Sequence, residues 1–192
     1  VLGCVIGGIT VTGLNPDSQQ GDKVILDILK RCGGKFKPVE GGLHFDRSLL
    51  KATEIDLADC PDLGPILFTL GCFCSGETVI RNAGRLRLKE SDRIEAMQTE
   101  LRKMGARIEV DGDTVHIQGV ALHAPNAPLS GHNDHRIVMA LAVAAIASGL
   151  PALLCGAEAV DKSWPAFWSV LRGLGAKVEL NTDKQEEFDI KA

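Results

Sequence analysis

The sequence predicts a mixed α/β (α+β) fold in which apolar helices pack inside outer β-sheets. Three observations lead to this prediction: a pattern that recurs about every 72 residues, two apolar runs long enough for buried helices, and an ordinary globular composition. Hydrophobic residues make up 45% of the 192 residues and charged residues 24%, which is enough apolar mass for a core. The same balance excludes a long disordered or collagen-like chain.

The recurring pattern starts with a helix, followed by a glycine and a strand. Residues 29–36, 101–108 and 171–178 align at offsets of 72 and then 70 residues. Each copy has basic residues, then a glycine, then a stretch of alternating apolar residues. Basic residues are favourable in the last turn of a helix, and a glycine just beyond that turn adopts the left-handed conformation that ends it. We therefore expect three helix-glycine-strand elements.

The repeat continues into a hairpin and a second helix. Residues 43–45 and 115–117 each follow an acidic-glycine turn, which is typical of a β-hairpin. Apolar helices are then expected after Pro61-Asp62 and after Asn133-Asp134, which again lie 72 residues apart. The expected helices and the strands that follow them are 63–74 with 78–80 and 136–147 with 152–154.

These elements indicate one domain over residues 1–180, built from three similar units. We interpret residues 21–90 and 91–161 as two full copies and residues 162–180 as the opening of a third. Residues 181–192 are polar and acidic, so we expect a mostly solvated tail.

Composition and cysteine spacing exclude several classes of protein. The formal net charge is −4, which does not favour a general nucleic-acid binder or a protein bound to anionic membranes. The apolar run Ile137–Ala147 has eleven residues, far short of the roughly 20 that span a bilayer. No Cys/His spacing suggests zinc, and the six cysteines lie in apolar runs, so we expect reduced, buried thiols in a cytoplasmic protein. The start at Val1, without Met, suggests a piece of a longer polypeptide.

A local excess of basic residues indicates an anion-binding site. Arg81, Arg85, Arg87, Lys89 and Arg93 lie within thirteen residues that contain only two acidic side chains. The alternative is a solvated basic face on an exposed helix.

The positions of three cations favour the anion site. Arg93 and Arg136 fall in the first turns of expected helices, and Lys162 precedes another helix start. A cation there opposes the helix dipole by roughly 0.3–1 kcal/mol. The same unfavourable placement at successive repeat junctions predicts that the junctions converge on one phosphate or carboxylate, held by cations and amide N–H groups.

Three further side chains beside these cations are suited to proton transfer. Asp62 could be a base or simply an N-cap, and Glu90 could be a base or part of a surface ion pair. His135 is compatible with a general acid, a hydrogen-bond donor to a ligand or a packed core histidine. The chain has no P-loop, dinucleotide-binding, nucleophile-elbow or zincin motif, so nucleotide, catalytic-triad and zinc-protease functions lose their best support.

Three segments together resemble the C-terminal half of the EPSP synthase family: Leu88–Arg93 (LKESDR), Asn133–Arg136 (NDHR) and Asp161–Ser163 (DKS). The resemblance extends over essentially the whole chain and is highly specific as a set. It implies two similar domains, each a pseudo-threefold repeat of βαβαββ-type units. Their active site lies in the cleft between the domains, so this chain would form one wall.

The resemblance also implies a reaction and roles for named residues. The family adds a shikimate 3-phosphate hydroxyl to phosphoenolpyruvate and then expels phosphate. It needs neither a metal nor an organic cofactor, it serves aromatic amino-acid biosynthesis, and it is the target of glyphosate. Asp62 would bind substrate at the shikimate hydroxyl and accept a proton there, Glu90 would move protons at the methylene group, and His135 would hydrogen-bond into the site. Substrate anions would be bound by Lys89, Arg93, Arg136 and Lys162, with Lys89 facing shikimate 3-phosphate and the others phosphoenolpyruvate.

Two departures and three alternatives accompany this interpretation. Arg85 stands where some members have an Asn that contacts substrate, so that contact is not assigned here. The ligands that the other half of the family's enzymes supplies are not in this sequence, so we expect no catalysis by this chain alone. The alternatives are an enolpyruvyl transferase acting on a UDP-amino sugar, a non-catalytic anion-binding domain, and a folded fragment with no activity of its own.

Overall fold

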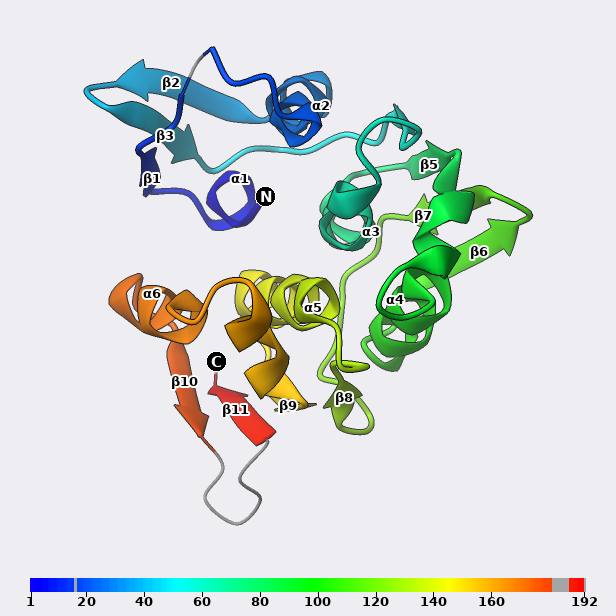
Figure 1. Cartoon of the computed structure of the whole chain (residues 1–192). Coiled ribbons are helices and arrows are strands. Elements are labelled where there is room, and N and C mark those ends of the chain that lie inside the picture. Colours follow the sequence, from blue (N-terminus) through cyan, green and yellow to red (C-terminus); the bar gives the residue numbers. More distant parts are fainter. Residues whose placement is uncertain (16, 181–186, 192) are drawn as a thin grey trace.

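In the computed structural model, three β-sheets surround a centre of apolar helices (Figure 1). The structure describes residues 1–15, 17–180 and 187–191. Helices α1 (Leu2–Ile6), α3 (Gly64–Phe73) and α5 (His135–Ser148) form this centre, in which α5 contacts both α1 and α3. The predicted fold class, with helices inside and sheets outside, is confirmed.

Two of the sheets have the same four-stranded topology. One has the order β4-β5-β7-β6, formed by Glu54–Asp56, Glu77–Arg81, Thr114–Gln118 and Arg107–Asp111. The other has the order β8-β9-β11-β10, formed by Leu129–Ser130, Ala152–Cys155, Glu187–Lys191 and Lys177–Leu180. In both sheets the first pair of strands is parallel and the other pairs are antiparallel.

The remaining sheet has the order β1-β3-β2, formed by Ile9–Thr12, Gly42–Asp46 and Lys35–Val39. Both of its pairs are antiparallel, and within the described residues it has no counterpart of β4 and β8. Equivalent apolar residues face each other in the three hairpins: Phe36 with Phe45, Ile108 with Ile117, and Val178 with Ile190.

The outer helices and the turns between elements follow the repeat. Helices α2 (Ile25–Arg31), α4 (Arg93–Lys103) and α6 (Phe167–Gly173) each lead into a hairpin. The glycines after them, Gly33, Gly105 and Gly175, have φ values of 82°, 86° and 94°. This left-handed conformation confirms the predicted helix-glycine-strand elements. Four short 3₁₀ helices complete the described elements: η1 (Gly21–Val24), η2 (Pro61–Leu63), η3 (Ala83–Leu88) and η4 (Ala157–Lys162).

The inner helices are apolar on nearly all sides because they are enclosed by the sheets. Eight of the ten residues of α3 are buried. Gly71 lies so close to β7 that a Cβ atom would be 3.0 Å from the Ile117 side chain. The Thr69 hydroxyl donates a hydrogen bond of 3.0 Å to the Ala140 carbonyl of α5, which satisfies a polar group inside the core.

The structure corrects the predicted limits of the repeat units. Each four-stranded sheet takes its strands from one continuous stretch, 54–118 or 129–191, in the order strand, inner helix, strand, outer helix, strand, strand. The predicted breaks after residues 90 and 161 therefore fall inside units. The sequence pattern recurs most visibly at the outer helices, whereas strand pairing defines the units.

The predicted solvated tail is wrong for residues 187–191. Strand β11 lies between β9 and β10, and Ile190 is 2% exposed. Strand β11 pairs with β9 in the antiparallel sense, as β7 pairs with β5, and the alternation of polar and apolar residues in Glu187–Lys191 suits that position. The rest of the predicted tail, residues 181–186 and 192, lies outside the described residues.

Two other predictions concern membranes and thiols. None of the helices that the structure describes is both long and apolar enough to cross a membrane. Cys4, Cys32, Cys60, Cys72 and Cys74 are buried thiols, as predicted, and Cys155 is partly buried.

Candidate active site

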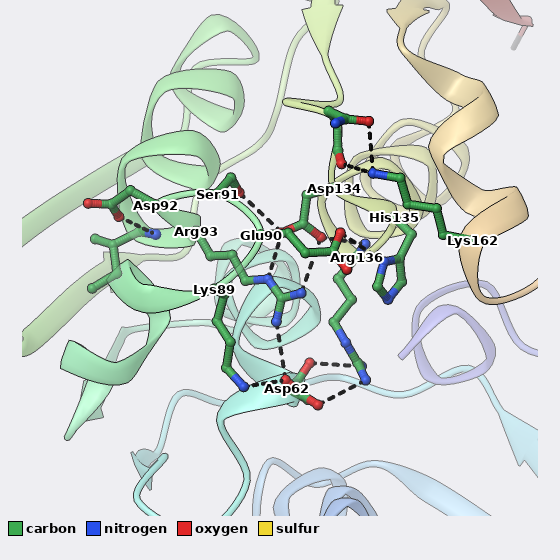
Figure 2. A network of polar contacts seen from close by, with 12 residues as sticks. Asp62, Lys89, Glu90, Ser91, Asp92, Arg93, Asp134, His135, Arg136 and Lys162 are labelled. Carbon is green, nitrogen blue, oxygen red and sulfur yellow. Dashed lines mark hydrogen bonds and ion pairs between the residues drawn. The ribbon is translucent and has the colours of Figure 1, made fainter.

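The N-terminal ends of α3, α4 and α5 and the C-terminal end of η4 bring the predicted site residues together (Figure 2). Asp62 precedes α3, residues 89–93 join η3 to α4, residues 133–136 lead into α5, and Lys162 ends η4. The repeat junctions therefore come together as expected, whereas the anion between them stays a prediction. Three helix N-termini face one region, and their partial positive charges favour an anion there.

Arg93 and Asp134 form a buried ion pair beneath this region. Their side chains are 3% and 0% exposed, and the guanidinium is bidentate, with distances of 2.8 Å from Nε to Oδ2 and 3.3 Å from Nη2 to Oδ1. Asp134 is also the N-cap of α5, where Oδ1 accepts from the Arg136 backbone N–H at 2.9 Å. Its Oδ2 accepts from the Ser91 hydroxyl at 3.1 Å. Each carboxylate oxygen thus accepts two hydrogen bonds.

These contacts determine the protonation of Asp134. Burial by itself would raise the pKa of Asp134, but the Arg93 hydrogen bonds and charge, with the Arg136 N–H and the Ser91 hydroxyl, lower it below its ordinary value. The residue is ionised at neutral pH and holds Arg93 in place. The Asp134 carboxylate, at the N-cap of α5, thereby compensates the unfavourable interaction of Arg93 with the dipole of α4.

Asp62 is partly exposed and faces three cations. Its Oδ1 is 3.0 Å from Lys89 Nζ and 3.2 Å from Arg93 Nη1. Arg136 donates to the Asp62 carbonyl at 3.0 Å through Nη1 and to Oδ2 at 3.2 Å through Nη2. Burial would raise the pKa of Asp62, but the Lys89 hydrogen bond and the charges of Arg136, Lys89 and Arg93 lower it. Neither η2 nor α3 has a side-chain cap hydrogen bond at its N-terminus, so the N-cap interpretation of Asp62 is wrong.

Glu90 and His135 form a second polar pair in the site. Glu90 Oε2 is 3.2 Å from His135 Nδ1, with side chains 40% and 14% exposed. Glu90, Asp134 and His135 are residue types that can bind a metal ion, and one potential ligand atom from each lies within 4.8 Å of the other two. Asp134 has no oxygen left for a metal ion, since both oxygens already accept two hydrogen bonds, and cations surround the group. This geometry does not favour a metal site.

Lys162 reaches back to the loop before α5. Its Nζ donates to the Asn133 side-chain oxygen at 2.8 Å and also to the Asn133 carbonyl. Asn133 has a φ of 54°, a left-handed conformation that Asn tolerates better than most residues. The sequence analysis did not predict the contact of Asn133 with Lys162 or the pairing of Asp134 with Arg93. A cation in the first turn of a helix is unfavourable without a counter-ion, and this was the signal in the sequence that could have pointed to a carboxylate partner.

The other arginines of the basic cluster serve local structure. Arg81 pairs with Glu54 at 2.6 Å, and Arg85 donates to the Ala58 carbonyl at 3.2 Å. Arg87 pairs with Asp92 at 3.3 Å, while Asp92 caps α4 through the N–H groups of its first turn. Of the five predicted basic residues, only Lys89 and Arg93 reach Asp62 among the described contacts.

Comparison with known proteins assigns the chain to a family. The family model for EPSP synthase (3-phosphoshikimate 1-carboxyvinyltransferase) matches residues 1–171. The chain belongs to the EPSP synthase family. Two curated 3-phosphoshikimate 1-carboxyvinyltransferases are similar to it: that of Clostridium acetobutylicum, with 44% identity over 176 residues, and that of Methanocaldococcus jannaschii, with 40% over 173 residues.

Both coverage and structure indicate one half of such a protein. The matches cover 92% and 90% of this chain but 40% of each relative, so the chain spans about two fifths of their length. The structure of EPSP synthase from Acinetobacter baumannii superimposes with a TM-score of 0.74 and 26% identity, covering 90% of this chain and 43% of that one. The fold is therefore consistent with one domain of the family's two.

Proposed function

We propose that the parent protein transfers the carboxyvinyl group of phosphoenolpyruvate to a hydroxyl of shikimate 3-phosphate, and that this chain forms one wall of the active site. The observation that carries the proposal is the convergence of Lys89, Arg93 and Arg136 on one carboxylate at distances of 3.0–3.2 Å. Both substrates are anions, and cations at helix N-termini are suited to hold them.

The reaction needs balanced proton transfers, and the site has groups for them. In the first step the acceptor hydroxyl forms a C–O bond to the substituted carbon of phosphoenolpyruvate, loses its proton, and the methylene gains a proton to become a methyl group. In the second step the C–O bond to phosphate breaks, the methyl loses a proton, and phosphate leaves. We assign the hydroxyl proton to Asp62 and the methylene proton to Glu90, which His135 orients at 3.2 Å.

The environment of Asp62 gives this assignment a physical mechanism. Three cations lower the pKa of Asp62, so it is a weak base while they face it. Substrate phosphate and carboxylate groups bound to Lys89, Arg93 and Arg136 would neutralise those charges and raise the pKa of Asp62. Binding of the anions would thus turn Asp62 into a stronger base when both substrates are in place.

The other proposed groups bind rather than react. Lys89 faces shikimate 3-phosphate, whereas Arg93, Arg136 and Lys162 hold the carboxylate and phosphate of phosphoenolpyruvate. Neither step transfers electrons, so no redox cofactor is required. The partner is the other half of the same enzyme, and we place the protein in the cytoplasm, which the five buried thiols support.

Acceptor choice tests the proposal. With the other half of the enzyme added, phosphate release from phosphoenolpyruvate is measured with shikimate 3-phosphate or with UDP-N-acetylglucosamine as acceptor. We expect release only with shikimate 3-phosphate. Release only with the UDP-sugar would assign the chain to a sister transferase. Binding without release, unaffected by Asp62→Asn and Glu90→Gln, would indicate an anion-binding domain instead.

A further inference from the structure

A second polar cluster is centred on Glu100, in the last turns of α4. The Glu100 side chain is 2% exposed, and its charge is held by three groups. Oε2 accepts from Lys103 Nζ at 2.7 Å and from the Ser130 backbone N–H at 2.8 Å. Oε1 is 3.1 Å from His132 Nε2. A buried carboxylate is stable only when paired in this way.

The groups bound to Glu100 belong to the loop that leads into the active site. Ser130 ends β8, and residues 131–134 connect it to α5. His132 and Asn133 have φ values of 49° and 54°, so two successive non-glycine residues adopt the left-handed conformation. Such a conformation is unfavourable and persists only where surrounding contacts enforce it. Glu100 supplies two of those contacts, to the Ser130 N–H and the His132 ring.

The same helix holds both ends of this loop. Arg93, in the first turn of α4, binds Asp134 at one end, and Glu100, seven residues later on the same face, binds Ser130 at the other. Between them Asn133 presents its carbonyl and side-chain oxygens to Lys162. The position of Lys162 and of the α5 N-terminus therefore depends on a loop clamped to α4.

We propose that Glu100 is a positioning residue that sets the site for phosphoenolpyruvate through this loop. The inference rests on the proposed function, in which Arg93, Arg136 and Lys162 bind that substrate. Glu100 contacts none of these cations in the described structure. It acts through Ser130, His132 and Asn133. Lys89, which we assign to shikimate 3-phosphate, comes from another segment and has no polar contact with the loop among the described residues, so we expect the binding of that substrate to depend less on the clamp.

The test compares three variants of this chain, each assembled with the other half of the enzyme. Glu100→Gln keeps the side-chain volume but removes the charge that Lys103 and His132 face. His132→Asn removes the contact between the imidazole ring and Glu100. Asparagine is chosen because it tolerates the left-handed backbone at this position. Glu109→Gln makes the same chemical change at an exposed position on β6 and serves as the matched control.

We expect Glu100→Gln to raise the KM for phosphoenolpyruvate about tenfold, since a charge-assisted hydrogen bond is lost. The KM for shikimate 3-phosphate should change less than about twofold, and the control should behave as the unchanged protein. His132→Asn, which loses a weaker bond, should raise the same KM about threefold. Unchanged KM values in both variants, or equal rises for both substrates, would overturn the proposal.

Two measurements that need no turnover separate this inference from the proposed function. Amide hydrogen exchange at Ser130 and modification of Lys162 by an amine reagent should both accelerate in Glu100→Gln. If the unchanged enzyme releases no phosphate, the proposed function fails, while unchanged exchange and reactivity in the variant would overturn the positioning role separately.

Discussion

Replacing Asp134 by Asn should destabilise the fold by about 3 kcal/mol, because it leaves a buried arginine without its counter-ion. Arg93 is 3% exposed and donates to both oxygens of Asp134. An Asn must place its NH₂ at one of these two positions, and either orientation points it at a guanidinium N–H. The remaining contact of Arg93 with Asp62 at 3.2 Å keeps the loss near the low end of the range of about 3–5 kcal/mol for broken buried pairs.

Urea unfolding at pH 7 followed by circular dichroism measures this loss as a shift in midpoint at constant slope. Asp59→Asn, the same change at an exposed position, should shift the free energy of unfolding by less than about 0.5 kcal/mol. Adding Arg93→Met to Asp134→Asn removes the uncompensated charge and should recover part of the loss. A loss below about 1 kcal/mol in Asp134→Asn would refute the argument that this pair holds the site together.

Three further predictions concern substrate binding, proton transfer and pH. Arg136→Lys should raise the KM for phosphoenolpyruvate about tenfold in the assembled enzyme, since an ammonium cannot reproduce the two-pronged contact of the guanidinium; an unchanged KM contradicts the assignment. Asp62→Asn should lower kcat by about 10²–10⁴-fold with Asp59→Asn as control, and a kcat loss fully explained by unfolding would leave Asp62 without a role as a base. The folded-state pKa of Asp134 lies below its unfolded value of about 3.9, so the stability it contributes is present above that pH and is lost as the pH falls through the folded pKa. The free energy of unfolding should therefore drop below about pH 4, and drop less in Asp134→Asn; parallel curves for the two proteins would contradict this.

Local signals in the sequence were sufficient to predict most of the fold. The ends of the outer helices could be predicted because a helix commonly ends at a residue in the left-handed conformation, which glycine favours. Gly33, Gly105 and Gly175 all adopt that conformation. The buried helices could be predicted because α3 and α5 are apolar on nearly all sides. Strand pairing depends on distant partners, so the role of Glu187–Lys191 as a central strand was missed.

The candidate site could be predicted in part, for a related reason. Cations at helix starts are unfavourable locally, so Arg93 and Arg136 stood out from the sequence and do converge on Asp62. Arg81, Arg85 and Arg87 carry the same charge, but their acceptors are Glu54, the Ala58 carbonyl and Asp92. Those partners become neighbours only after folding.

The most direct test of the central claim is phosphate release from shikimate 3-phosphate plus phosphoenolpyruvate, measured for this chain alone and with the other half of the enzyme added. Orienting two substrates in a closed cleft lowers the activation free energy by roughly 7–11 kcal/mol. One wall of the cleft cannot supply this orientation. We predict no measurable release by the chain alone, and turnover that glyphosate inhibits once both halves are present. Release by the chain alone near the enzyme median of about 10 s⁻¹ would contradict the account.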